Sequence, residues 1–477
     1  MLPYNLNDKE SIIEFAKLLI GKSVQSEFAD EIVLLKINAK DKGRLGKVIE
    51  ELYFGYKPNS NPQADFKEAG LELKASGLKK LAKNKGFNAK ERLVLSKINY
   101  NEAVNKDFEK DFLTGKNAHL LLVFYLYEKG INILESIIKL VGDWEYSEVD
   151  IEIIRKDFEF IKQKISEGKA HELSEGQTNY LGACTKAKDS KVLVKQPNSN
   201  VLAKPRAYSL KPGYVNHIIA SIANPQNNNY GKLITSISVA KKQTLEEVVL
   251  AKFKPLIGKS VDELIEKLPI SPINPGSKDY HAKLSKAIVK SIFDVPKNKE
   301  IENYIQEFEK AEILVKTVRL KDSNLPAEDI SFPCFEYLEL VAEEWEDSDF
   351  KHILNRKFLF VFFQFDNEKL VLGKVKFWNM PNPDVEEAKK VWVETIKIVN
   401  NGDIVKSVRL SKDGKEIRNT NFPGKRFNKI AHVRPHTSDA SNTYPLPVRD
   451  KVTQEMKYTK YSFWLNAAYV KDEIYLK

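Results

Sequence analysis

The chain has 477 residues, with 76 Lys and Arg against 66 Asp and Glu, so its formal net charge is +10 at pH 7. This length exceeds one ordinary hydrophobic core and predicts about two to four domains, while the positive charge favours nucleic acid without requiring it. Two distant cysteines, Cys184 and Cys334, exclude a disulfide framework, and no apolar run is long enough to span a membrane, so we expect a cytoplasmic protein without a membrane partner.

The first motif in chain order is Leu-Ile-Gly-Lys-Ser-Val at residues 19–24, which returns at residues 256–261, nearly half the chain later. A phosphate-binding loop is excluded because Ala16 and Phe253 stand where its first glycine would be. Each copy is therefore predicted to form the turn after a first helix. A repeat of this length indicates a duplicated domain.

A candidate catalytic motif follows, in which Asp65 precedes a strand predicted at residues 70–75. Period-two alternation turns the leucines of that strand towards a core and Glu72 and Lys74 towards the opposite face. Two carboxylates suit a divalent cation and a neighbouring lysine suits an attacking water, which predicts a metal-dependent phosphodiesterase. The alternative is a solvated hairpin with an outer polar face, because this pattern arises easily in a chain that is 30% charged.

The coarse pattern of each half predicts an α/β fold. The apolar runs at residues 120–126 and 358–363 are expected to be buried central strands, and residues 44–54 carry an apolar helical stripe. Each half should therefore be a mixed β-sheet flanked by helices. Residues 224–231 are polar and rich in turn formers, as in a linker. We expect a first domain at residues 1–225, a linker at 226–240 and a second domain at 241–477.

The two halves differ in their acidic residues. The aligned pairs are Glu50 with Val289, Asp65 with Glu307, Glu72 with Leu314 and Lys74 with Lys316. Leu314 cannot ligate a hard cation. The second half is therefore predicted to keep the fold and a binding surface but to be catalytically inactive.

Longer strings of the sequence resemble two related groups of nucleases. The resemblance to the DNA mismatch-repair endonuclease MutH covers roughly residues 10–225, in residues 42–46, Glu50, 65–66, 70–74, Lys116 and 179–181. The whole chain resembles the larger GATC-cutting type II restriction endonucleases of the Sau type, in residues 90–95, 168–176, 343–348 and 432–437.

The resemblance implies two tandem restriction-endonuclease-like (MutH-like) domains that act with Mg²⁺ on double-stranded DNA containing GATC. The first domain would cut, and the second, decayed domain would bind another GATC as an effector, as in type IIE enzymes. Because a palindrome is cut on both strands, a DNA-dependent homodimer is expected. A cognate DNA methyltransferase would act on the same site. The alternatives are a MutH-like repair nickase and a non-catalytic DNA-binding protein.

The resemblance also implies catalytic roles. Asp65 and Glu72 would hold the metal ion, and Lys74 would polarise the attacking water or the scissile phosphate. Glu50 would support the metal site, and Lys116 would face the phosphate backbone. Without the resemblance, the favoured interpretation of Lys116 is an ordinary solvated lysine before a buried strand.

Base recognition is expected from segments in both halves. The candidate DNA-binding residues are Thr185, Lys186, Tyr208, Ser209 and Lys211 in the first half, and Arg434, Pro435 and His436 in the second. Lys186 would donate to guanine O6 and N7. MutH carries Arg-Pro before that lysine, where this chain has Cys184 and Thr185, and a tyrosine associated with methylation sensing where it has Ser209. Arg434 is therefore the best candidate for an effector-site contact.

Overall fold

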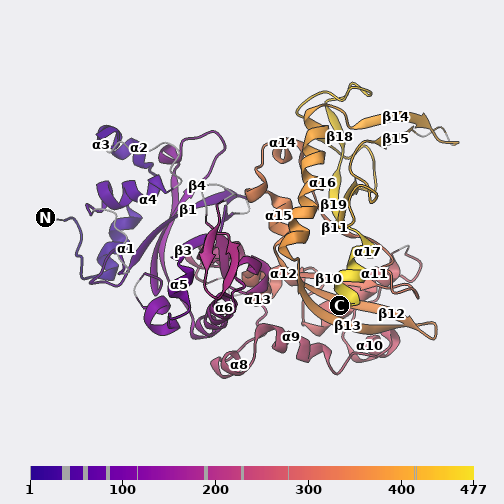
Figure 1. The fold of residues 1–477 in the computed structure, drawn as a ribbon, viewed down its shortest axis with the longest axis horizontal. Coiled ribbons are helices and arrows are strands. Elements are labelled where there is room, and N and C mark those ends of the chain that lie inside the picture. The colour runs from indigo at the N-terminus through magenta and orange to yellow at the C-terminus, as the bar shows by residue number, and fades with distance from the viewer. Residues whose placement is uncertain are drawn as a thin grey trace. The chain divides into compact units, whose positions relative to one another are not determined.

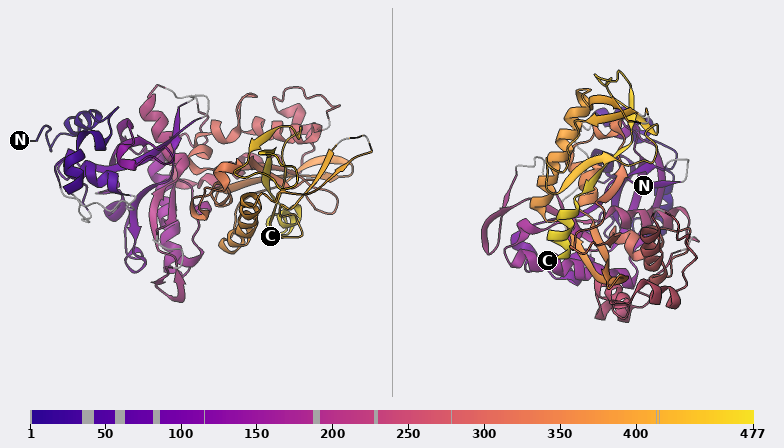
Figure 2. Two further views of the ribbon diagram at one scale, coloured as in Figure 1. Left: turned by 90° about the horizontal axis from the view of Figure 1, so that it is seen from above. Right: turned by 90° about the vertical axis from the view of Figure 1, so that its right-hand side faces the viewer.

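The computed structural model describes residues 2–34, 43–56, 63–81, 86–114, 116–186, 192–226, 230–277, 279–412, 414 and 416–477. Lys42 of the MutH-like string and residues 227–229 of the predicted linker lie outside them. The chain divides into two compact units (Figures 1 and 2). Unit 1 comprises Met1–Val248 and Glu302–Glu312, and unit 2 comprises Val249–Ile301 and Ile313–Lys477. Among the described residues, no helix combines the length and apolar character needed to cross a membrane.

Unit 1 is a mixed α/β structure. Its strands are β1 (Glu72–Lys80), β2 (Phe87–Ala89), β3 (Leu93–Ile98), β4 (His119–Leu126), β5 (Ile138–Glu145), β6 (Leu181–Thr185), β7 (Val194–Gln196), β8 (Ser199–Ala203) and β9 (Arg206–Leu210). Its helices include α1 (Lys9–Lys17), α2 (Val24–Glu27), α3 (Ala29–Leu34), α4 (Arg44–Val48), α5 (Tyr100–Ala103), α6 (Glu148–Ser166), α7 (Pro212–Ala223), α8 (Ile237–Lys242) and α13 (Gln306–Ala311). Short helical turns are η1 (Ile49–Tyr53), η3 (Phe108–Leu113), η4 (Ile133–Glu135), η5 (Ala170–Glu172) and η6 (Glu175–Gln177).

Unit 2 is also mixed. Its strands are β10 (Leu314–Arg319), β11 (Ile330–Cys334), β12 (Lys357–Asp366), β13 (Lys369–Asn379), β14 (Val405–Leu410), β15 (Glu416–Thr420), β16 (Ala431–Pro435), β17 (Thr443–Pro445), β18 (Lys457–Thr459) and β19 (Tyr461–Leu465). Its helices are α10 (Val261–Lys267), α11 (Tyr280–Ile292), α14 (Tyr337–Leu340), η7 (Trp345–Asp347), α15 (Asp349–Leu354), α16 (Asn382–Asn400), α17 (Ala467–Tyr469) and η8 (Val470–Tyr475). Helices α9 (Leu245–Phe253) and α12 (Ile301–Tyr304) each cross a boundary between the units.

The two units contain sheets with the same strand pairing. In unit 1, β4 runs parallel to β1 and antiparallel to β5, and in unit 2, β12 runs parallel to β10 and antiparallel to β13. A second sheet places β9 between β3 and β6, and its counterpart places β19 between β11 and β16. Every residue of β4 is buried, as are residues 357–363 of β12. The predicted buried strands and mixed α/β architecture are thus confirmed.

The repeated Leu-Ile-Gly-Lys-Ser-Val motif forms the same turn in both units. Gly21 and Gly258 adopt φ values of +87° and +83°, which glycine tolerates best. The Gly21 N–H donates to the carbonyl of Ile138 on β5 at 2.9 Å, and the Gly258 N–H donates to that of Leu372 on β13 at 2.7 Å. The serine that follows then caps α2 or α10. The prediction of a turn after a first helix is therefore confirmed.

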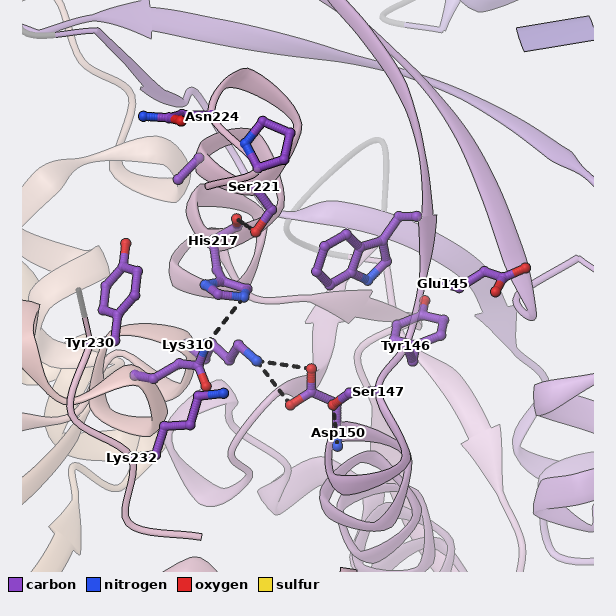
Figure 3. Close-up of a pocket in the computed structure, with 14 residues that line it drawn as sticks. Glu145, Tyr146, Ser147, Asp150, His217, Ser221, Asn224, Tyr230, Lys232 and Lys310 are labelled. Atoms are coloured by element: carbon purple, nitrogen blue, oxygen red, sulfur yellow. Dashed lines mark hydrogen bonds and ion pairs between the residues drawn. The ribbon is translucent and has the colours of Figure 1, made fainter. Parts of the chain in front are cut away.

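Helix α13 packs inside unit 1 through a buried ion pair (Figure 3). Lys310 Nζ lies 2.8 and 2.9 Å from the two carboxylate oxygens of Asp150 on α6. Beside this pair, Gln306 Nε2 lies 3.3 Å from Nε2 of His217, and a cavity of about 320 Å³ adjoins them. Burial and the charge of Lys310 lower the pKa of His217 to about 3. The buried acid thus compensates the buried lysine.

Glu307, the residue aligned with Asp65, also belongs to unit 1. Its buried carboxylate accepts hydrogen bonds from the main-chain N–H groups of Leu233 and Ile234, at 2.8 to 3.1 Å. Those contacts satisfy main-chain donors that would otherwise lack partners. In this arrangement Glu307 therefore has a structural task.

Candidate active site

A tight hairpin brings Asp65 beside the first residue of β1. Phe66 and Leu71 form an antiparallel bridge, with the Phe66 N–H donating to the Leu71 carbonyl at 2.9 Å. The Asp65 N–H then donates to Glu72 Oε2 at 3.2 Å. Glu72 has only 2% of its surface exposed, so the alternative of a solvated hairpin is wrong for this residue.

Two lysines approach the same oxygen of Glu72. Lys74, on β1, hydrogen-bonds Glu72 Oε1 through its ammonium group, and Lys116 Nζ lies 3.7 Å from that oxygen. Because β1 and β4 are parallel, with Glu72 opposite Leu120, Lys116 just before β4 reaches the same end of the sheet. Both lysine side chains are about one-fifth exposed. The site therefore combines a buried carboxylate with two accessible cations.

Glu50 completes the acidic group from a neighbouring helix. It lies on η1, a π-helical turn that continues α4, and such turns often occur at functional sites. Burial and the charge of Asp65 raise the pKa of Glu50 to about 7, although the charge of Lys74 opposes this rise. Burial likewise raises the pKa of Glu72, despite Lys74. The structure thus brings together all five predicted catalytic residues.

Tyr56 is a further member of this environment that the sequence patterns missed. Its hydroxyl is buried and has no hydrogen-bond partner within the described part of the chain. Its ring packs on Phe66, 5.3 Å between centroids, and burial together with the charges of Asp65, Glu50 and Glu72 raises its pKa far above the usual range. No charge pattern or periodicity marks a lone tyrosine in this way.

The donor set fits a magnesium ion. Over the described ranges, no three or more His, Cys, Asp or Glu side chains converge as a ready-made metal cage. Mg²⁺ does not need one, because it commonly binds one or two carboxylates and takes its other ligands from water and substrate phosphate. Asp65 and Glu72 would supply hard oxygen ligands of that kind, and burial raises the pKa of Glu72, so a cation beside it would favour its charged form.

The predicted DNA-binding residues of unit 1 fall into two groups. Thr185 ends β6, half-buried, and Lys186 follows it with an exposed side chain. By contrast, Tyr208, Ser209 and Lys211 are only 3%, 1% and 2% exposed. The Lys211 ammonium donates to the main-chain carbonyls of Thr178 and Ala311, at 2.6 and 3.4 Å. Buried side chains cannot contact DNA, so the predicted DNA contacts of Tyr208, Ser209 and Lys211 are wrong for this structure.

The predicted residues of unit 2 lie on its surface. Arg434, Pro435 and His436 are exposed at the end of β16. Arg434 pairs with Ser462 on β19, in the register position that Cys184 occupies opposite Ala207 on β9. The guanidinium group of Arg434 lies 4.5 Å above the ring of Trp464.

Fold and site together define an α/β nuclease of the MutH type, and residues 54–157 match the family model of the DNA mismatch repair enzyme MutH. The chain is 36% identical over 493 residues to the type II restriction enzyme Sau3AI of Staphylococcus aureus, covering 98% of both chains. It therefore belongs to the family of that enzyme and is a type II restriction endonuclease. MutH proteins of Shewanella sp. (strain W3-18-1) and Vibrio parahaemolyticus are 24% and 26% identical, over 46% and 44% of this chain and 95% and 91% of theirs.

Proposed function

We propose that this restriction endonuclease cleaves both strands of duplex DNA at GATC with Mg²⁺, and that unit 1 performs the cut. The observation that carries the proposal is the convergence of Asp65, Glu72 and two lysines at one end of the parallel strands β1 and β4. That combination suits hydrolysis of a phosphodiester, where an anionic substrate must approach carboxylates.

Each side chain has a definite task in this proposal. Asp65 and Glu72 hold Mg²⁺, which when bound supplies Lewis-acid stabilisation of the phosphate. Lys74 orients the attacking water or the scissile phosphate, and Lys116 offsets negative charge on the DNA backbone. Glu50 supports the two metal ligands from η1. Lys186, exposed after β6, donates to guanine.

We further propose that unit 2 derives from the same ancestral domain and binds a second GATC as an effector. The shared strand pairing and the shared Gly-Lys turn support this. Leu314 begins β10 opposite Phe358, as Glu72 begins β1 opposite Leu120, so the carboxylate needed for a metal is missing there. The exposed Arg434 and His436 fit a DNA-binding role. The boundaries predicted from the sequence, 1–225, 226–240 and 241–477, remain a proposal for the two duplicated domains, whereas the compact units also assign residues up to 248 and residues 302–312 to unit 1.

The proposal also includes a homodimer that forms on DNA and is activated when the DNA carries two GATC sites. A palindrome presents two scissile bonds related by a two-fold axis, so a DNA-dependent homodimer meets it symmetrically. A cognate methyltransferase acting on GATC would protect the host. A plasmid with one GATC site should accordingly be cut more slowly than one with two. Equal cleavage rates of the two plasmids, at low enzyme and matched site concentrations, would refute the effector role.

Substitution at the site tests the cutting role. Asp65→Ala and Glu72→Ala should each lower cleavage by more than about 100-fold, because each removes a metal ligand. Binding to GATC duplex without Mg²⁺ should survive. Glu68→Ala, which removes an exposed carboxylate in the same hairpin, is the matched control. Unchanged cleavage in both variants would refute the site.

The second candidate function is a MutH-like nickase, which the similarity of unit 1 to MutH proteins favours. The form of the plasmid product distinguishes the two. A nickase leaves open circles as the end product, whereas the proposed enzyme produces linear DNA. Binding of GATC duplex with no cleavage under any divalent cation would instead indicate a non-catalytic DNA-binding protein.

A further inference from the structure

A buried carboxylate in unit 2 holds two exposed cations. Asp329 has 4% of its side chain exposed, and its Oδ2 lies 2.7 Å from Lys425 Nζ and 3.5 Å from a terminal nitrogen of Arg434. The other oxygen accepts a hydrogen bond from the Ala467 N–H at 2.9 Å. The side chains of Lys425 and Arg434 are 56% and 50% exposed. Asp329 is thus anchored to the backbone on one side and faces the two cations on the other.

The guanidinium group of Arg434 also lies over an aromatic ring. Its guanidinium carbon lies 4.5 Å from the ring centre of the half-buried Trp464, and the ring of His436 lies 5.0 Å from the same indole. The buried His432 adds a nitrogen 3.8 Å from Asp329 Oδ2, and burial lowers its pKa, which favours the neutral form. A guanidinium that lies over an aromatic ring and beside a carboxylate is restrained on two sides, which favours planar, bidentate recognition.

The corresponding ion pair in unit 1 has its charges reversed. Arg92 immediately precedes β3, as Asp329 precedes β11, and these strands pair with β9 and β19 in the same way. Glu175 precedes β6 by the same number of residues as Lys425 precedes β16 (181 − 175 = 431 − 425). Arg92 and Glu175 form an ion pair too.

The reversed charges of the ion pair change which charge is exposed at the surface of each unit. In unit 1 both partners are partly buried, with 25% and 15% of the Arg92 and Glu175 side chains exposed. In unit 2 the acid is buried and the base is exposed, so the same framework presents positive charge. Exposed cations beside an aromatic face suit a polyanion with stacked, planar acceptors, which is the chemistry of duplex DNA.

We propose that Asp329 is the positioning residue of the second DNA site, where it aims Arg434 at a base edge and Lys425 at a neighbouring phosphate. This inference rests on the proposed effector function of unit 2. Without the carboxylate, Arg434 and Lys425 would lose their shared partner and repel each other, and Arg434 would keep only its contact with the Trp464 ring. The arginine would then leave the geometry that a bidentate contact requires.

The test measures activation by DNA added in trans. A plasmid with one GATC site is cleaved by the full-length enzyme in the presence of a GATC duplex, and the duplex concentration giving half-maximal stimulation is recorded. Asp329→Asn should raise that concentration about tenfold, the scale of one good base contact. Saturating duplex should restore the wild-type rate, because the change affects occupancy of the second site.

Two further variants separate positioning from folding. Glu455→Gln breaks a remote pair with Arg418 in the same unit and should leave the stimulation curve unchanged. The double variant Asp329→Arg with Lys425→Glu copies the charges of the Arg92–Glu175 pair. Because Asp329→Arg also removes the acceptor of the Ala467 N–H, this variant should melt at a lower temperature than wild type, and it should still require more duplex.

The outcomes distinguish the role of Asp329 from the proposed effector function of unit 2. If the wild type is stimulated and Asp329→Asn shows the wild-type half-maximal concentration, the role of Asp329 is wrong while the effector site stands. If the wild type is not stimulated by any GATC duplex, both fail. A lower maximal rate of Asp329→Asn at saturating duplex, with no shift in concentration, would also overturn the positioning role.

Discussion

Asp65 and Glu72 are linked across the hairpin: the Asp65 N–H donates to Glu72 Oε2 at 3.2 Å, and Asp65 Oδ2 accepts a hydrogen bond from the Leu73 N–H at 3.1 Å. These reciprocal contacts fix both carboxylates before any cation arrives. A preformed site needs little reorganisation on binding. Burial raises the pKa of Glu72, and a bound cation would stabilise its charged form.

Magnesium affinity should therefore depend on pH. Glu50 has a pKa of about 7, so without a cation this carboxyl is largely protonated below neutrality, and its contribution to stability is lost as the pH rises through 7. A cation favours the charged form, so binding should release protons and tighten between pH 6 and 8. Calorimetric titration in two buffers of different ionisation enthalpy counts the protons. Glu50→Gln should flatten this dependence, and a wild-type affinity independent of pH would contradict the electrostatic account.

Tyr56→Phe should separate metal binding from stability. The buried hydroxyl lacks a partner among the described residues, so its removal should leave the melting temperature of the metal-free protein almost unchanged. If the hydroxyl instead pairs with water brought by the cation, magnesium affinity should fall by about three- to tenfold. The rise in melting temperature on adding Mg²⁺ measures this magnesium affinity.

Tyr53→Phe is the control for that variant. The Tyr53 hydroxyl donates to the Phe15 carbonyl at 2.6 Å, away from the carboxylates. Its loss should lower the free energy of unfolding by about 1 kcal/mol and leave magnesium affinity unchanged. The same affinity in Tyr56→Phe as in wild type would show that the Tyr56 hydroxyl takes no part in the site.

The sequence predicted the geometry around Glu72 well, because that argument was local. Strand alternation placed Glu72 and Lys74 on one face, and their side chains do meet. The DNA contact that the family resemblance implied for Lys211 conflicts with the structure, because its ammonium is buried against the Ala311 carbonyl, a contact between residues 100 apart in the chain. That contact exists because residues 302–312 join unit 1, which no local pattern reveals.

The buried Lys310–Asp150 pair should stabilise unit 1 strongly against loss of either partner. Lys310→Met leaves the Asp150 carboxylate buried without its cation and should lower the free energy of unfolding by about 3–5 kcal/mol. Combining it with Asp150→Asn should recover part of that loss, since the two charges no longer need each other. Denaturant titration of the four proteins of this cycle measures the coupling. Strictly additive losses would mean that the pair contributes nothing.

Glu309 should make the stability of unit 1 fall as the pH rises. Burial raises its folded pKa to about 7 from the ordinary value of 4.5, although a hydrogen bond from Tyr230 opposes the rise. Between these two pH values the unfolded chain loses a proton that the folded chain keeps, so stability is highest below 4.5 and decreases through 7. Glu309→Gln removes this penalty and should gain on the order of 2 kcal/mol over wild type at pH 8, but almost nothing at pH 4. Glu135→Gln, at an exposed position of unit 1, controls for the loss of a carboxylate. A gain at pH 8 no larger than at pH 4 would show that Glu309 is ionised in the folded protein without cost.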